Sequence, residues 1–292
     1  MEFTAQLQAY RDRAEQAVQA CRPKHGPARL NEATDYALAA GGKRLRPILL
    51  LATADLLGAA PHSAEPAAAA VEYIHTYSLI HDDLPCMDND DLRRGRPTLH
   101  KQFDEALALL AGDALLTHAF HQLALSYADQ PARCAKLTLE LGCAASGFQL
   151  IGGQVEDLQA EKNPNITVEQ LRSIHLKKTA AMITVSLVMG GIVADAPREQ
   201  IEILREAGER IGLAFQIIDD ILDATADTKT LGKTAGKDAK ADKTTYVKLH
   251  GLDASRRYAR EYSDAAKAAL ARLPGGAPFL TALVEDMAKR TR

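Results

Sequence analysis

Two groups of aspartates stand out in this sequence because each one follows an apolar, helix-like pattern. The first is DDLPCMDND, Asp82–Asp90, and the second is DDILD, Asp219–Asp223. Carboxylates from separate helices can hold Mg²⁺ that also contacts the phosphates of a substrate. Arg93 and Arg94 follow the first group closely, and the cationic stretch GGKRLRP lies upstream at 41–47. The pattern indicates an enzyme that acts on a diphosphate ester with an apolar tail.

The acids have two other interpretations. The first group could be a solvated acidic turn, or it could be a calcium loop. The calcium loop fits poorly because Leu92 stands where such a loop needs a ligand. The helical period places His75 and Asp82 on one half-buried face, and it places Asp219 and Asp223 one turn apart, where they can chelate together. We therefore interpret both groups as parts of a divalent-cation site.

The basic residues point to phosphate. Lys43 and Arg46 fall on one side of a helix that begins there, and Gly41-Gly42 leaves backbone N–H groups available, as helix starts that bind phosphate do. Arg93 and Arg94 can point in different directions from a turn and so contact two different anions. One arginine alone is usually a surface charge, but four cations beside two acidic groups favour a substrate site.

Several segments, taken in order, resemble those of the short-chain trans-isoprenyl diphosphate synthases, specifically the bacterial farnesyl diphosphate synthase type. They are GGKRLRP, IHTYSLIHDDLPCMDNDDLRRGRPTLH, LAGDALL, GGQVEDL, the pair Lys178-Thr179, FQIIDDILD and GKTAGKDAKADKTTY. The resemblance implies an all-α bundle around a deep central cavity, with the acidic motifs facing each other across its mouth, and a homodimer. It also implies head-to-tail condensation of isopentenyl diphosphate with dimethylallyl and geranyl diphosphates.

The resemblance further assigns roles to individual residues. The residues expected to hold three Mg²⁺ ions are Asp82, Asp88 and Asp219, with Asp83 and Asp223 in support. Those matching the isopentenyl diphosphate pocket are Lys43, Arg46, His75 and Arg94. Those matching contacts to the allylic diphosphate and the developing cation are Arg93, Lys178, Thr179, Gln216, Lys233 and Lys243, among which Lys178, Thr179 and Gln216 are the predicted catalytic residues. Gln154 and Asp157 are expected to line the cavity.

The chemistry agrees with this resemblance. Breaking a carbon–oxygen bond to release diphosphate builds negative charge, which metal ions and Lys or Arg donors stabilise by about 3 kcal/mol per well-placed donor. Apolar helix faces would keep water from the allylic cation. The double bond of isopentenyl diphosphate then attacks, and we expect the released diphosphate to take the proton. No side-chain nucleophile is needed.

Product length is expected to depend on the residues just before the first motif. Tyr77 precedes Asp82 by five positions, about 7.5 Å of helix rise, and Ser78 precedes it by one turn. In the family a bulky aromatic at the position of Tyr77 is associated with a fifteen-carbon stop, so we predict farnesyl diphosphate as the main product. Alternatively, Tyr77 simply packs against a neighbouring helix.

Competing functions remain to be distinguished. A geranylgeranyl or geranyl diphosphate synthase would share the chemistry and stop at another length. A terpene cyclase would not need the second diphosphate pocket, and a non-catalytic subunit would be expected to have lost aspartates. Both aspartate motifs are whole here.

Composition supports a helical enzyme without nucleic acid as its main partner. The chain has 292 residues, of which 47% are hydrophobic, 5% aromatic and none Trp, which favours helices over a β-sandwich. A net charge of −3 argues against a phosphate backbone as partner. Four cysteines without a CxxC pair and an N-terminus unlike a signal peptide favour a cytoplasmic location. The uncharged run Thr179–Ala194 is shorter than the roughly 20 residues of a membrane span, so no transmembrane segment is expected.

Helical periodicity dominates, and no convincing strand alternation is present. Helices are predicted over 3–20, 28–40, 46–57, 66–84, 102–127, 133–158, 167–194, 197–223, 254–272 and 278–290. The stretch 227–243 is the one long loop, and a loop of that length is usually functional. Because no break is long enough to be a domain linker, the sequence predicts a single all-α domain over 1–292 with about ten helices.

Overall fold

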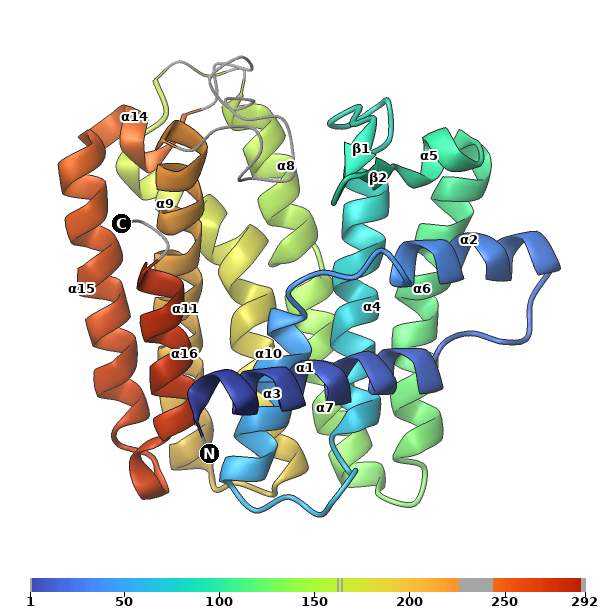
Figure 1. The fold of residues 1–292 in the computed structure, drawn as a ribbon, viewed down its shortest axis with the longest axis horizontal. Coiled ribbons are helices and arrows are strands. Elements are labelled where there is room, and N and C mark those ends of the chain that lie inside the picture. Colours follow the sequence, from blue (N-terminus) through green and yellow to red (C-terminus); the bar gives the residue numbers. More distant parts are fainter. Residues whose placement is uncertain (1, 162, 164, 226–243, 290–292) are drawn as a thin grey trace.

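The computed structural model describes residues 2–161, 163, 165–225 and 244–289 (Figure 1). Regular structure in these ranges is almost entirely helical, as predicted. The helices are α1 (Phe3–Ala20), α2 (Ala28–Leu38), α3 (Leu45–Leu56), α4 (Glu65–Asp82), α5 (Leu99–Gln102), α6 (Glu105–Ser126), α7 (Pro131–Ala145), α8 (Leu150–Ala160), α9 (Val168–His175), α10 (Ala181–Val193), α11 (Arg198–Thr225), α14 (Tyr246–His250), α15 (Leu252–Leu270) and α16 (Pro278–Lys289), with a π-helical turn at Leu176–Ala180 and a 3₁₀ turn at Pro274–Gly276.

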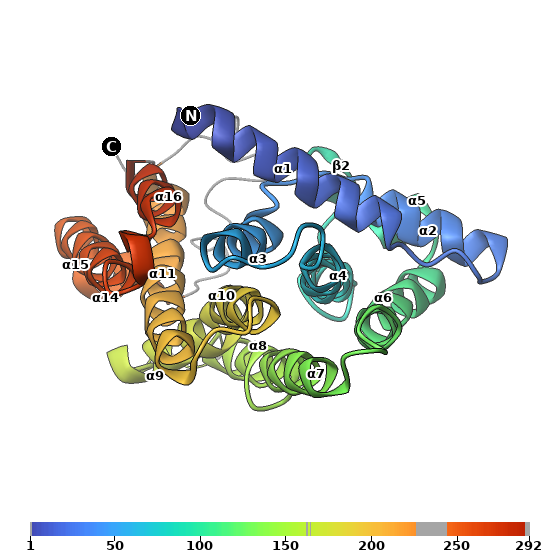
Figure 2. The same ribbon diagram turned by 90° about the horizontal axis from the view of Figure 1, so that it is seen from below.

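Helices α3, α4 and α10 form the inside of the bundle, and the other long helices surround them (Figure 2). Every residue of α10 from Met182 to Val193 is buried, because this helix is apolar on all sides. The stretch Val168–Val193 is long and apolar enough to cross a membrane, but 72% of its most apolar window is buried inside the protein. It therefore packs as a core helix does.

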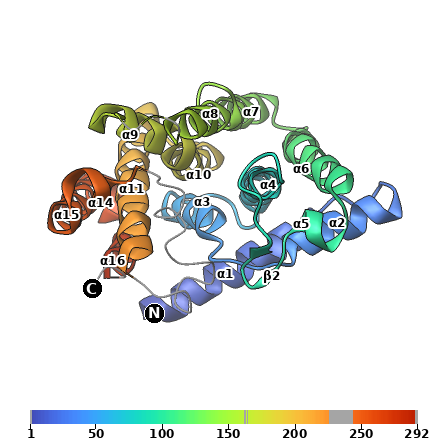
Figure 3. The ribbon, with the colours of Figure 1, turned by 90° about the horizontal axis from the view of Figure 1, so that it is seen from above.

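The two acidic groups lie at the same end of the bundle. Helices α4 and α11 both finish at the upper end in Figure 1, and Figure 3 looks down on that end. The C-terminal end of a helix carries partial negative charge, so carboxylates placed there are destabilised unless cations stand nearby. The fold thus brings the carboxylates of both groups to one end of the molecule, where cations are needed.

Some predicted boundaries were wrong. The predicted helix over 133–158 is broken at Ser146–Gln149, where the hydroxyl of Ser146 accepts a hydrogen bond from the N–H of Phe148 and ends α7. The predicted helix over 102–127 is interrupted before Asp104, whose carboxylate accepts from the N–H of Leu107 and caps α6. Both side chains offer the backbone a local alternative to a continuous helix.

Short elements were also missed. Two antiparallel strands, β1 (Leu92–Arg93) and β2 (Arg96–Pro97), pair directly after the first acidic group, although no strand was predicted. Helix α14 was not predicted either. Two residues per strand and a single turn of helix are too short to show periodicity. The predicted long loop at 227–243, with Lys233 and Lys243, lies outside the described residues.

Candidate active site

Asp82 is the last residue of α4 and occupies a poor position for a negative charge. Burial raises its pKa to about 6, and the charges of Asp88 and Asp83 act in the same direction, while Lys178 and Arg93 oppose them. The loop folds back so that the N–H of Asp88 donates to the carbonyl of Asp82 at 2.8 Å. A half-buried carboxylate beside other carboxylates is a group that a divalent cation would stabilise.

Asp83 is buried and bound to Arg93. The guanidinium donates from Nε to both carboxylate oxygens at 2.7 and 2.8 Å and from Nη2 to Oδ1 at 2.5 Å. Burial raises the pKa of Asp83, and the hydrogen bonds and charge of Arg93 counteract part of that rise. Both residues thus have a partner within the chain, so any bound ion or phosphate would share them.

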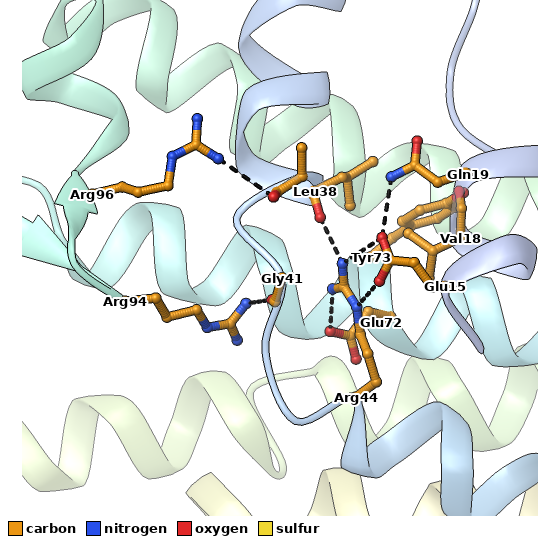
Figure 4. Close-up of polar contacts among 11 residues, drawn as sticks. Glu15, Val18, Gln19, Leu38, Gly41, Arg44, Glu72, Tyr73, Arg94 and Arg96 are labelled. Atoms are coloured by element: carbon orange, nitrogen blue, oxygen red, sulfur yellow. Dashed lines mark hydrogen bonds and ion pairs between the residues drawn. The ribbon is translucent and has the colours of Figure 1, made fainter. Parts of the chain in front are cut away.

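The β1–β2 turn brings Arg94 to the GGKRLRP loop. Arg94 has a left-handed backbone (φ 54°), and its guanidinium donates to the carbonyl of Gly41. A Cβ on Gly42, where φ is 130°, would lie 2.5 Å from Cζ of Arg94. The positive φ of Gly42 favours glycine, and a Cβ there would force the guanidinium of Arg94 to move. Residues far apart in the sequence therefore meet at this turn (Figure 4).

Arg46 and His75 belong to the same cluster. Among the residues that the structure describes, none forms a hydrogen bond with the buried Nε of Arg46. Burial lowers the pKa of Arg46, although the charges of Glu72 and Asp219 oppose that effect. Burial, followed by the charges of Arg46 and Arg94, holds the pKa of His75 well below its ordinary value, so His75 is neutral at physiological pH. An incompletely satisfied guanidinium among other cations is a suitable place for an anion.

Lys43 extends toward α11. Its Nζ lies 5.9 Å from the centre of the Phe215 ring, within the range of a cation–π contact. Lys43 thus reaches the helix that carries the second acidic group, next to the predicted residue Gln216.

The predicted residues Lys178 and Thr179 lie on the π-helical turn between α9 and α10. Nζ of Lys178 is 2.7 Å from a carboxylate oxygen of Asp157, and Oγ1 of Thr179 donates to the side-chain carbonyl of Gln216 at 2.8 Å. A Cβ on Gly153 would lie 2.5 Å from the backbone nitrogen of Lys178. This glycine of GGQVEDL therefore lets α8 pack against the turn. Inserted π turns of this kind occur frequently at functional sites.

Asp220 has a structural role that the sequence did not reveal. It is buried, and it accepts hydrogen bonds from Nε2 of Gln216 at 3.1 Å and from the backbone N–H of Tyr246 at 2.9 Å. A chain of hydrogen bonds therefore runs from Thr179 through Gln216 and Asp220 to the start of α14. This arrangement fixes the amide of Gln216. In the sequence, only the position of Asp220 on the buried side of the helix could have distinguished its structural role from that of Asp219.

The second acidic group lies partly exposed on α11. Asp219 and Asp223 are half-buried, and the charge of Asp219 reaches Arg46. Within the part of the chain that the structure describes, no three carboxylate, imidazole or thiol groups come close enough to surround one ion. The aspartates nevertheless fit Mg²⁺ chemically, because they offer only hard oxygen donors and because the ionised form of Asp82 lacks stabilisation.

The predicted chain-length residues lie below Asp82 on α4. Tyr77 is buried, and its hydroxyl forms no hydrogen bond with the part of the chain that the structure describes. The centres of the Tyr77 and His81 rings are 5.6 Å apart, in an edge-to-face arrangement. Oγ of Ser78 donates to the carbonyl of His75 at 2.9 Å, so that hydroxyl is used within the helix. Gln154 is half-buried on α8 and Asp157 is buried.

The sequence analysis missed the acids behind the cation cluster. Glu72 is buried on α4 and pairs with Arg44 at 2.8 Å, and Glu15 of α1 pairs with the same guanidinium at 2.8 Å. Glu72 lies on the apolar face of a predicted helix, and this could have revealed the ion pair, because a buried acid needs a partner.

The chain is similar to proteins of known type. Residues 27–271 match the family model described as polyprenyl synthetase. The heterodimeric geranylgeranyl pyrophosphate synthase large subunit 1, chloroplastic, of Arabidopsis thaliana is 49% identical over 86% of this chain and 69% of its own length. The chloroplastic geranylgeranyl pyrophosphate synthase of Catharanthus roseus is 48% identical over 90% of this chain and 74% of its own length. These relatives do not support the specifically bacterial farnesyl type that the sequence suggested.

Solved structures share the fold. An FPP/GFPP synthase from Zymomonas mobilis superposes with a TM-score of 0.85 at 36% identity and covers 98% of both chains. A geranyltransferase from Helicobacter pylori, complexed with magnesium and isoprenyl diphosphate, superposes with a TM-score of 0.83 at 33% identity and covers 97% of this chain and 96% of that one. The predicted all-α, isoprenoid synthase-type bundle is thereby confirmed.

Proposed function

This chain belongs to the polyprenyl synthetase family and is a prenyltransferase, and we propose that it condenses isopentenyl diphosphate with an allylic diphosphate and releases diphosphate. The observation that supports this most directly is the cluster of Arg46, neutral His75 and Arg94 beside the acidic end of the bundle. A cation cluster in addition to the aspartates would give a second diphosphate its own site, which a condensation needs and a cyclisation does not.

We propose that the aspartates hold the allylic diphosphate through Mg²⁺. Asp82, Asp88 and Asp219 would be the ligands of three ions, with support from Asp83 and Asp223. When bound, Mg²⁺ stabilises the negative charge that develops on the leaving diphosphate. The separation of the carboxylates into two groups fits ions that are shared between the protein and a phosphate.

The residues of the chain itself would bind and orient the substrates. Lys43, Arg46 and Arg94 would hold the diphosphate of isopentenyl diphosphate, and neutral His75 would add a hydrogen bond without further repulsion. Arg93 and Lys178 would contact the allylic diphosphate, and each cation would then be shared between the diphosphate and its carboxylate partner, Asp83 or Asp157. The amide of Gln216 and the hydroxyl of Thr179, fixed by Asp220, would face the developing cation. Lys233 and Lys243, proposed for the same substrate, lie outside the described residues.

A direct assay tests this function. We expect the purified chain with Mg²⁺, dimethylallyl diphosphate and labelled isopentenyl diphosphate to give labelled prenyl diphosphates, and we expect excess EDTA to abolish turnover until Mg²⁺ is restored. Chromatography of the products measures both. Cyclised products without incorporated label would identify a terpene cyclase instead, and no product from the chain alone would identify a non-catalytic subunit.

We propose farnesyl diphosphate as the product, because the buried ring of Tyr77 lies below Asp82 on α4. The tail would extend along this helix away from the metals. Geranylgeranyl diphosphate is the second candidate, and the names of both plant relatives favour it over farnesyl diphosphate. Geranyl diphosphate has no comparable support.

Changing Tyr77 separates these products. If its bulk stops the chain, Tyr77→Ala will shift the main product to geranylgeranyl diphosphate or longer. Tyr77→Phe is the matched control: it should keep the wild-type product because the hydroxyl makes no hydrogen bond. Reverse-phase chromatography of dephosphorylated products measures the change. The same chain length from the wild type and Tyr77→Ala would leave Tyr77 as a packing residue.

We also propose a homodimer, one domain over 1–292 and a cytoplasmic location. The dimer is supported by large apolar side chains that are exposed on or beside the neighbouring helices α6, α7 and α8, namely Leu109, Leu110, Leu139, Phe148, Ile151 and Val155. The single domain is supported by a large hydrophobic cluster that extends from α1 to α16, and α11 contributes both to it and to a smaller second cluster. Four cysteines without disulfides agree with the location, whereas the plant relatives are named as chloroplastic.

A further inference from the structure

Arg44 is fully engaged inside the protein, although it stands within the phosphate-binding motif. Its side chain is 1% exposed. Nε donates to Glu15 at 2.8 Å, Nη1 to Glu72 at 2.8 Å, and Nη2 to the carbonyl of Leu38 at 2.6 Å (Figure 4). Because each guanidinium nitrogen already has an acceptor, Arg44 is not placed to bind a substrate phosphate. Its role must concern what it holds together.

These contacts join three elements at the base of one loop. Glu15 comes from α1, Glu72 from α4 and Leu38 from the end of α2, and the loop 39–43 runs between α2 and α3. Arg44 itself is the N-cap residue of α3 and has a left-handed backbone (φ 48°), a conformation that a non-glycine residue adopts at an energetic cost. The surrounding ion pairs can offset that cost.

The other side of this loop receives the cations of the β1–β2 hairpin. The carbonyl of Gly41 accepts from Arg94, and the carbonyl of Ala39 accepts from Arg96 at 3.3 Å. Lys43 directly precedes Arg44, and Arg46 follows it two positions later. A shift of the loop would therefore move several groups of the proposed isopentenyl diphosphate pocket together.

The acids also balance the charge of the cluster. Glu72 is the strongest opposing charge for both Arg46 and Arg94. Burial works against ionisation of Glu15, but the hydrogen bonds and charge of Arg44 outweigh it and lower the pKa of Glu15, and Arg94 adds to this effect. The cations can thus stay close together before any diphosphate arrives.

We propose that Glu15 and Glu72 are positioning residues, which act through Arg44 to hold the loop 39–43 so that Lys43, Arg46 and Arg94 are arranged for the diphosphate of isopentenyl diphosphate. This inference rests on the proposed function and assigns to α1, outside the motifs of the sequence analysis, a part in binding one of the two substrates.

The test compares two carboxylates, each of which forms an ion pair that links α1 to another part of the chain. Glu15→Gln removes one of the two acids on Arg44. Glu65→Gln is the matched control, because Nε of Arg13 on α1 pairs with Glu65 on α4 at 2.7 Å and would keep its second partner, Asp55, at 2.7 Å. Both variants weaken the docking of α1, but only Glu15 is connected to the loop. Glu15 is also partly exposed, so its replacement should leave the protein folded.

Two measurements are expected to separate the variants. Glu15→Gln should raise KM for isopentenyl diphosphate about fivefold, the effect of losing roughly 1 kcal/mol of hydrogen bonding, and should change kcat and KM for the allylic substrate less than about twofold. Backbone hydrogen exchange over 39–46, measured by mass spectrometry without substrate, should become faster in Glu15→Gln. Glu65→Gln should match the wild type in both measurements.

The outcomes distinguish this inference from the proposed function. Unchanged exchange over 39–46 in Glu15→Gln, or equal changes in Glu65→Gln, would overturn the positioning role whatever the enzyme does. Faster exchange with an unchanged KM for isopentenyl diphosphate would overturn the link to that substrate. A wild-type chain that incorporates no isopentenyl diphosphate would defeat the proposed function, and the exchange result would still decide whether Glu15 holds the loop.

Discussion

Replacing Asp82 with asparagine is expected to lower kcat on the order of 10³-fold while helix content stays normal. The substitution keeps the shape of the side chain and removes the negative charge that would bind Mg²⁺ against the leaving diphosphate, and losses of this size are typical when transition-state charge stabilisation is removed. Asp219→Asn should have a similar effect from the opposite helix. Steady-state rates at saturating substrates, with circular dichroism for helix content, measure both.

Asp91→Asn is the control, because Asp91 directly follows the first acidic group. Asp91 is exposed and pairs with Lys101 at 2.9 Å on the surface. Its neutralisation should change kcat less than about twofold, because surface ion pairs contribute little. Near-normal turnover in Asp82→Asn or Asp219→Asn would contradict the metal assignment, and equal losses in Asp91→Asn would mean that the motif acts through its total charge.

Arg94→Met is expected to raise KM for isopentenyl diphosphate by roughly 10- to 100-fold, because charge-assisted hydrogen bonds to phosphate contribute about 1.5–3 kcal/mol. KM for the allylic substrate should change little, since Arg93, which pairs with Asp83, is proposed for that diphosphate. Initial rates with each substrate varied in turn measure the two constants separately.

Arg96→Met provides the comparison. Arg96 comes from the same hairpin, and its guanidinium lies 4.1 Å from the centre of the Tyr36 ring, where it stacks and donates to the loop carbonyl of Ala39. We expect KM for isopentenyl diphosphate to change less than about threefold in this variant. If Arg96→Met raises KM for isopentenyl diphosphate as much as Arg94→Met does, the hairpin acts by holding the loop in place and not by contacting the phosphate.

Much of the fold could be read along the chain, because short-range periodicity determines helices. The first helix was predicted at 3–20 and spans Phe3–Ala20, and the wholly apolar stretch after Ala180 is the core helix α10. The breaks at Ser146–Gln149 and before Asp104 were not predicted, because they depend on single side chains that bond to nearby backbone. The candidate site residues came from the resemblance to a family, because the motifs follow the same order along the chain even where they are far apart.

The sequence by itself determined which residue types are present and in what order: carboxylates at the ends of two apolar helices, and arginines beside glycines. Only the tertiary structure decided which partners these side chains bind. Arg44 and Arg46 are two positions apart in the sequence. Arg44 forms ion pairs with Glu15 and Glu72, whereas Nε of Arg46 has no hydrogen-bond partner among the described residues. Asp219 and Asp220 likewise differ. Asp219 is half-buried and its charge acts on Arg46, whereas Asp220 is buried and accepts a hydrogen bond from the first N–H of α14. The physical reason is that hydrogen bonding of a charged side chain depends on partners from distant segments, which the local period cannot specify.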